Sequence, residues 1–96
     1  MKFTLIKSPN AKKKWRAVFT DEDGHETHTD FGDATMEDYT QHKNPLRREN
    51  YLTRHRARED WNDYKSAGSL SRHLLWGNST SLQQNIASFR RRFSLS

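Results

Sequence analysis

The 96-residue chain contains no cysteine, only two prolines and four glycines, and no long apolar run. Without cysteine there is neither a disulfide framework nor a thiolate metal site, which suits a reducing compartment. A membrane-spanning helix needs roughly 20 consecutive apolar residues, and a signal peptide needs an apolar core longer than Phe3–Ile6. We therefore expect a soluble protein with no membrane span and no leader.

Apolar residues are also scarce, at 31% of the chain, against a usual value of about 45–50% with glycine counted. Three tryptophans, three tyrosines and five phenylalanines partly compensate, because each aromatic side chain can bury roughly 150–250 Å². A core of this size cannot be divided, so we expect one domain over residues 1–96. Its net stability should lie near the low end of about 5–15 kcal/mol. We also hypothesise that a partner completes the burial of some large aromatics.

The net charge of +5 arises from blocks of opposite sign. Residues 1–19 carry six basic residues and no acid, whereas residues 20–41 carry eight acids and no lysine or arginine. Residues 42–65 are mixed, and residues 66–96 carry four arginines and no acid. A protein that only coats nucleic acid would seldom concentrate acids in this way. The blocks indicate complementary docking, in self-assembly or with a partner, about as well as they indicate phosphate binding.

The first third of the chain has the alternation of β-strands. Phe3 and Leu5 alternate with polar neighbours, and Trp15, Ala17 and Phe19 share one face of a second strand. Residues 8–11 and the acidic stretch 21–24, which ends in a glycine, have turn composition. Residues 25–31 alternate again. These patterns predict a three-stranded antiparallel meander over residues 1–32 with one aromatic face.

The rest of the chain predicts about three helices. Asn44-Pro45 is an N-cap followed by proline at the first helical position, and it predicts a helix over residues 44–60 with a sparse stripe of Leu46, Tyr51, Leu52 and His55. Ser69 predicts the cap of a short helix over residues 69–76 that Gly77 would end, after a loop over residues 61–68. Ser81 to Gln84 fits a capping box for a helix over residues 81–93. Strands followed by helices predict an α+β fold, with the helices packed on one face of the sheet.

Histidines and acids outside the sheet core favour a structural polar network. His25 and His28 are three apart in a strand, so they point to opposite faces and suit shared metal ligation poorly. His55 and Glu59 are neighbours on one helix face, and a carboxylate there could orient the imidazole of a general base. No nucleophile and no phosphate-gripping loop accompany them, so catalysis is the less favoured interpretation. The predicted network comprises Asp38, Tyr39, His42, Arg54, His55, Glu59, Trp61, Arg72 and Trp76.

Two basic clusters are candidate contact surfaces for phosphate or for an acidic partner. They comprise Lys12, Lys13, Lys14 and Arg16 on the first hairpin, and Arg90, Arg91 and Arg92 on the last helix. Trp15 lies inside the first cluster, and Phe89 and Phe93 flank the second, an interleaving found in proteins that bind single strands. The alternative is that these aromatics point into the core and the charges are solvated. The helical stripe of Leu82, Ile86, Phe89 and Phe93 favours that alternative.

The middle and end of the chain also resemble a protein family. The motifs are Phe31-Gly32, Asp38-Tyr39-Thr40-x-His42, Tyr51-x-x-Arg54-His55-x-x-x-Glu59-x-Trp61, Ala67-Gly68-x-Leu70-Ser71-Arg72, Leu75-Trp76 and Arg92-Phe93. In these the chain resembles small proteins encoded by large double-stranded DNA viruses of algae and other protists, although Ser66 stands where threonine is expected. The resemblance implies a viral origin and a place in the virion and in the cytoplasm or nucleus of the host cell. The resemblance implies no chemical reaction for this chain.

These observations predict a non-enzymatic structural or interaction module without a cofactor or metal. A minor capsid-associated protein that docks other virion structural proteins through its charges and aromatics is the first hypothesis. A basic protein that binds the viral DNA or RNA is the second, and a nuclease-like enzyme using His55 and Glu59 is a distant third. The sequence leaves the oligomeric state open.

Overall fold

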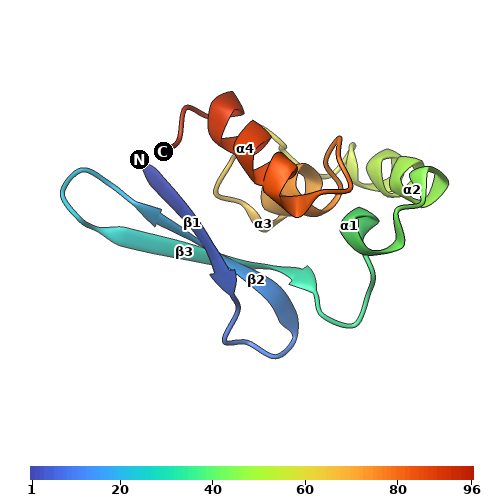
Figure 1. Ribbon diagram of the computed structural model, residues 1–96, viewed down its shortest axis with the longest axis horizontal. Coiled ribbons are helices and arrows are strands. Elements are labelled where there is room, and N and C mark those ends of the chain that lie inside the picture. Colours follow the sequence, from blue (N-terminus) through green and yellow to red (C-terminus); the bar gives the residue numbers. More distant parts are fainter.

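A computed structural model describes residues 1–96 and confirms the predicted α+β fold (Figure 1). Strands β1 (Lys2–Lys7), β2 (Lys13–Thr20) and β3 (Glu26–Asp33) form an antiparallel sheet in the order β1-β2-β3. The helical elements that follow are α1 (Tyr39–His42), α2 (Pro45–His55), α3 (Ala67–Leu70), the π-helix η1 (Ser71–Leu75) and α4 (Leu82–Arg92). None of these helices combines the length and the apolar content needed to cross a membrane.

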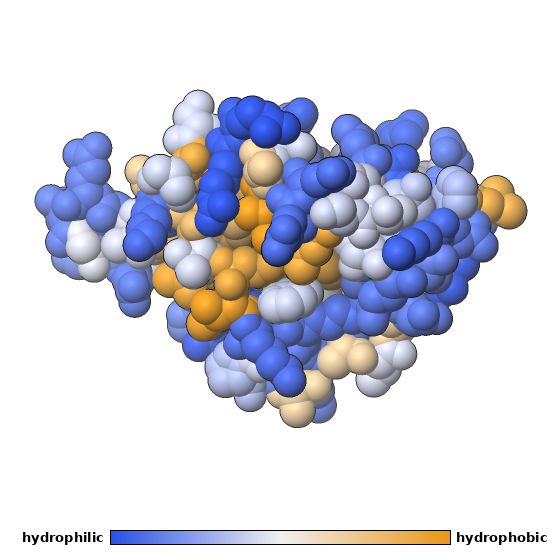
Figure 2. Space-filling view, viewed as in Figure 1, coloured by the Kyte–Doolittle hydropathy of each residue, from blue (hydrophilic) through white to orange (hydrophobic).

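The predicted aromatic face of the sheet forms half of the core. Phe3 lies opposite Phe19 in the β1–β2 ladder, and Trp15 lies opposite Phe31 in the β2–β3 ladder. Phe3, Phe19 and Phe31 are buried, while Trp15 is half-buried against them. The other half of the core comes from Leu70, Leu74, Leu75 and Phe89, which lie on the helices that cover this face. The core is small, and Figure 2 shows apolar surface still accessible in the middle of one face, with hydrophilic residues around it.

Helix α2 begins as predicted and ends earlier than predicted. Asn44 caps it by accepting hydrogen bonds from the amides of Leu46 and Arg47, and Pro45 is the first helical residue. The predicted continuation to residue 60 is wrong, because the chain turns after His55. The turn lets the Trp61 carbonyl reach the Ser69 hydroxyl and His73 Nε2, both at 2.9 Å. These tertiary bonds outweigh the helix propensity of residues 56–59.

Leu46 was expected on the buried stripe of α2, but it is 69% exposed. It lies in the first turn of α2, beyond the surface that the other helices cover, and only Tyr51 and Leu52 of this helix are buried. Helix α2 therefore contacts the rest of the fold through its middle and its end. The thin core thus leaves Leu46 in solvent, along with Met1, Ile6 and Met36.

The short helix predicted over residues 69–76 begins two residues earlier and changes its winding. Ser66, not Ser69, is the N-cap, because its hydroxyl accepts a hydrogen bond from the Ser69 amide. Ser69 is fully buried and donates to the Trp61 carbonyl instead. After Leu70 the helix widens into η1, where the Trp76 amide bonds to the Ser71 carbonyl. The predicted loop over residues 61–68 is thus shorter by two residues.

Helix α4 closes the fold onto the sheet. Ser81 is its N-cap, as predicted, but the Gln84 side chain accepts from the Ser79 hydroxyl and so does not complete the capping box. Phe89 is 1% exposed, and its ring centroid lies 5.1 Å from that of Phe3. The chain end then returns to β1, where the Phe3 amide donates to the Ser96 carbonyl at 2.9 Å. The two termini consequently lie side by side (Figure 1).

Candidate functional site

An open cleft of about 980 Å³ lies between α2, the end of β3 and the α3–η1 segment. Its floor includes Phe31, Gly32 and Leu75, and α2 forms one wall. Gly32 has φ +81°, and a Cβ there would lie only 2.8 Å from Leu75 Cδ1. Glycine is therefore required at this position for two reasons, the backbone conformation and the close approach of η1 to β3.

A stack of aromatic rings lines the cleft behind α2. The Tyr51 ring stacks on His55 with a centroid distance of 4.1 Å and on Trp76 with a distance of 4.2 Å and an interplanar angle of 3°. The His42 ring contacts Trp76 at 5.3 Å. Burial raises the pKa of the Tyr51 phenol well above its ordinary value. The aromatic rings that line the cleft are already packed against one another.

The polar groups next to this stack form a second chain of contacts. His55 Nδ1 lies 3.1 Å from Glu59 Oε1, and Trp61 Nε1 donates to the same oxygen at 3.3 Å. The Glu59 carboxylate rests on Gly68, where a Cβ would collide with it. The Arg72 guanidinium lies 5.1 Å above the Trp61 ring. The carboxylate is thus held from three sides at the edge of the cleft.

Asp38 and Tyr39 enter the network through α1. Asp38 is 3% exposed and caps α1 by accepting from the Thr40 amide at 2.9 Å. Lys14 Nζ reaches it from β2 at 2.7 Å and also donates to the Gln41 side chain at 2.6 Å. The Tyr39 ring lies 6.3 Å from that of His42. Lys14 therefore ties α1 to the sheet.

Arg54 is the one member of the predicted network that makes none of these contacts. Its side chain is exposed and lines the cleft. Arg48, which belongs to none of the predicted sites, is a central connector instead. Its Nε donates to the Gly77 carbonyl at 2.8 Å, and its Nη2 donates to Asn78 Oδ1 at 2.9 Å. Spacing could have identified it, because Arg48 is three, four and seven residues before Tyr51, Leu52 and His55 and shares their helix face.

The seven residues of the predicted basic patch do not form one surface. Arg90 donates to the Phe3 carbonyl at 2.9 Å, at the start of β1, whereas the Lys14 carbonyl accepts from the Ser8 amide, just beyond the other end of that strand. The two clusters therefore lie at opposite ends of β1. Lys12 and Lys13 are exposed, Arg91 donates to Ser88, and Arg92 donates to Asn62.

Arg16 is paired within the sheet. It makes two hydrogen bonds to its cross-strand neighbour Asp30, at 2.8 and 3.1 Å. These bonds raise the pKa of Arg16 above its ordinary value and lower the pKa of Asp30 below its own. Of the first cluster, only the two exposed lysines thus keep side chains without an acid partner.

Three unpaired cations line the cleft. Two of its other basic residues have acid partners, since Lys14 pairs with Asp38 and Arg47 lies 4.0 Å from Glu37. Lys13, Arg54 and Arg58 also line the cleft, and none of their side chains takes part in a hydrogen bond or an ion pair. We call these three residues the cleft cations.

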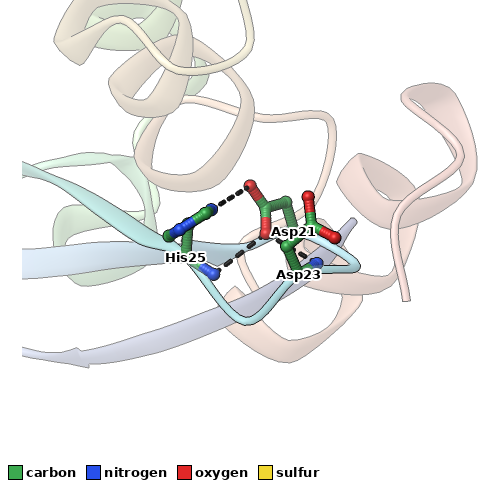
Figure 3. A group of neighbouring side chains, drawn as sticks. All are labelled: Asp21, Asp23 and His25. Atoms are coloured by element: carbon green, nitrogen blue, oxygen red, sulfur yellow. Dashed lines mark hydrogen bonds and ion pairs between the residues drawn. The ribbon is translucent and has the colours of Figure 1, made fainter.

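The β2–β3 hairpin brings together Asp21, Asp23 and His25, which Figure 3 shows in detail. Asp21 Oδ1 accepts from the amides of Asp23 and His25, both at 2.9 Å, and Asp21 Oδ2 lies 3.5 Å from His25 Nδ1. These contacts shape the turn, in which Gly24 has φ +83°. Turn formation accounts for the arrangement, and His25 is oriented by Asp21.

Two partly buried histidines predict a loss of stability in mild acid. Burial lowers the pKa of His73 and of His42 in the folded protein, whereas both should titrate near about 6.5 in the unfolded chain. Below that value the unfolded state binds more protons, so stability is full above about pH 6.5 and falls as the pH drops through it. The urea midpoint should therefore be lower at pH 5.5 than at pH 7.5.

Replacing His73 by glutamine should reduce this pH dependence, because the amide keeps a donor for the Trp61 carbonyl but does not titrate. The control is His28→Gln, on an exposed position of β3, which should leave the difference between the two midpoints unchanged. Equal pH dependence in wild type and His73→Gln would show that His73 does not contribute.

Comparison with known proteins gives one match. Residues 3–55, which span the sheet, α1 and α2, match a family of unknown function (DUF5754). No curated protein and no solved structure matches the chain. The resemblance to proteins of large DNA viruses therefore stays a prediction. Because the match covers more than half of the chain and includes the strand and helix that line the cleft, the protein belongs to the DUF5754 family.

Proposed function

We propose that the protein is a non-enzymatic interaction module that docks an acidic segment of a protein partner in the cleft beside α2. The observation that carries this proposal is the set of cleft cations, Lys13, Arg54 and Arg58, which line one open cleft and take part in no ion pair, with Asp33 opposite Lys13 in the β2–β3 ladder. Unpaired cations around a concave surface attract carboxylates and orient them during docking.

The packing of the aromatic rings favours a protein partner over nucleic acid. Proteins that bind single strands need free aromatic faces on which bases stack. Tyr51 is covered on one side by His55 and on the other by Trp76. The acids Asp33, Glu37 and Glu59 also line the cleft, so it suits a few separate carboxylates placed at the cleft cations better than a continuous phosphate backbone. DNA or RNA binding remains the alternative, favoured by the net charge of +5.

A catalytic role for His55 and Glu59 has less support. The two groups contact each other, and Glu59 also accepts from Trp61. A general base acts on a substrate group within hydrogen-bond reach, whereas here both side chains are already engaged with groups of the fold. The arrangement has the pattern of a network that holds the end of α2 against α3.

The proposal predicts binding of a glutamate-rich peptide to the full chain. The double substitution Arg54→Glu/Arg58→Glu should weaken binding at least about tenfold, which corresponds to about 1.4 kcal/mol. The control is Arg91→Glu, which reverses the charge of an exposed arginine on α4 and should change the affinity by less than about twofold. Fluorescence anisotropy of the labelled peptide at about 50 mM salt measures both. Equal losses in the two variants would contradict docking in the cleft.

The nucleic-acid alternative is tested in the same assay with labelled single-stranded and duplex DNA. Specific phosphate contacts would make the logarithm of the affinity fall by about 0.9 per logarithm of salt for each duplex contact. The proposal expects weaker binding of DNA than of the acidic peptide at every salt concentration.

A place in a virus particle rests on the resemblance to proteins of large DNA viruses alone, and cross-linking mass spectrometry of purified particles would test it.

A further inference from the structure

The tip of the β2–β3 hairpin carries three exposed acids. Glu22, Asp23 and Glu26 are exposed and make no ion pair, while Asp21 is used inside the turn. We call Glu22, Asp23 and Glu26 the tip acids. They provide the kind of acidic segment that the cleft would attract.

The tip and the cleft lie too far apart to meet within one molecule. The protein is elongated, with extents of 42 × 28 × 25 Å. Figure 1 shows the β2–β3 turn at one end of the long axis and α2 at the other. The tip acids can therefore reach a cleft only on another molecule.

We propose that the hairpin tip of one copy of this chain docks in the cleft of a second copy. This inference rests on the proposed function and names the partner of the same site. The tip offers three unpaired acids, and the cleft offers three unpaired cations, Lys13, Arg54 and Arg58. Each molecule thus offers both halves of the contact, and the two halves have opposite charge.

The tip is preorganised for such a contact. The Asp21 carboxylate accepts from two backbone amides of the turn (Figure 3). Gly24 takes the left-handed conformation that the turn requires. A turn that is already ordered loses little conformational freedom on docking. The contact is electrostatic and lies at the surface, so it should weaken with salt, since the screening length falls from about 30 Å at 0.01 M to about 8 Å at 0.15 M.

The test is sedimentation velocity on the full chain at low salt over a wide concentration range. Wild type should self-associate as its concentration rises and should return to monomer at high salt. The tip variant Glu22→Lys/Glu26→Lys and the cleft variant Arg54→Glu/Arg58→Glu should each stay monomeric to at least about tenfold higher concentration. Mixed together they should form a 1:1 complex, because each supplies the charges that the other has lost. Arg91→Glu should associate like wild type.

The outcomes separate this inference from the proposed function. If wild type binds a glutamate-rich peptide in the cleft but stays monomeric throughout, the self-docking inference is overturned and the proposed function stands. Loss of association in the cleft variant alone would also overturn it, since another acidic surface would then be the occupant. If neither peptide binding nor association depends on Arg54 and Arg58, both proposals fail.

Discussion

Replacement of Phe89 by alanine is expected to lower the free energy of unfolding by about 3–5 kcal/mol, the usual cost of truncating a buried phenylalanine. Phe89 is 1% exposed, and its ring contacts those of Phe3 and Phe93 at 5.1 Å each. It links α4 to the sheet through Phe3. Because a small domain has only about 5–15 kcal/mol of net stability, this variant should unfold well below the wild-type urea midpoint.

The comparison variant for Phe89→Ala is Phe93→Ala, one turn further along the same stripe and only partly buried. Phe93→Ala should lower the free energy of unfolding by clearly less than Phe89→Ala. If the two substitutions shift the urea midpoint equally, the closure of α4 onto the sheet would not depend on the Phe3–Phe89 contact.

Replacement of Asn85 by alanine should cost about 2–4 kcal/mol, because each buried group left without a partner costs about 1–3 kcal/mol. Asn85 is 2% exposed, and its amide nitrogen donates to the Leu74 and Ser79 carbonyls at 3.0 and 2.8 Å. Its oxygen accepts from the Ser79 amide at 3.1 Å. This one side chain therefore fixes the turn between η1 and α4. Chemical denaturation monitored by far-ultraviolet circular dichroism would measure the loss.

Gln84→Ala provides the control for Asn85→Ala on the same helix, since Gln84 is exposed and makes one side-chain bond, to Ser79. Its effect should stay within about 0.5 kcal/mol. Asn85→Asp should be destabilising as well, because a carboxylate cannot donate to the Leu74 carbonyl. If Asn85→Asp left the free energy of unfolding unchanged, the two hydrogen bonds that the Asn85 amide donates would contribute little.

The alternation of large side chains made the sheet predictable. Phe3, Phe19 and Phe31 alternate with residues of the opposite face in their strands, so a slip of one residue would move one of them to the other face, and the structure places all three on the same face. The stripe of α4 was predictable for the same reason, because Phe89 lies on the face marked by Leu82 and Ile86. In these elements local pattern and tertiary burial agree.

The helical elements between α1 and α4 were harder to predict, because tertiary contacts decide them. The end of α2 depends on bonds from the Trp61 carbonyl to residues 69 and 73, and the widening at η1 depends on a bond between Ser71 and Trp76. Neither has a local signature. Glycine is needed at position 77 for close packing and not to end a helix, since a Cβ there would collide with the His73 carbonyl and the Asn85 side chain.

The candidate site was predictable in part. Seven of the nine residues named for the polar network lie in two adjoining sets of contacts around Trp76 and Glu59, and Asp38 caps α1 beside them. Arg54 lies outside those contacts, and the cleft itself could not be foreseen. Arg54 and Arg58 come from α2 and the turn after it, whereas Lys13 comes from β2, and only the folded chain brings them to one opening.

The most direct measurement of the central claim is the change in backbone amide chemical shifts when the ¹⁵N-labelled full chain is titrated with a glutamate-rich peptide. Docking in the cleft predicts the largest changes at Lys13, Asp33 and residues 47–58, with little change at residues 88–96. Changes concentrated at Arg90, Arg91 and Arg92, or spread evenly over the basic surface, would contradict it.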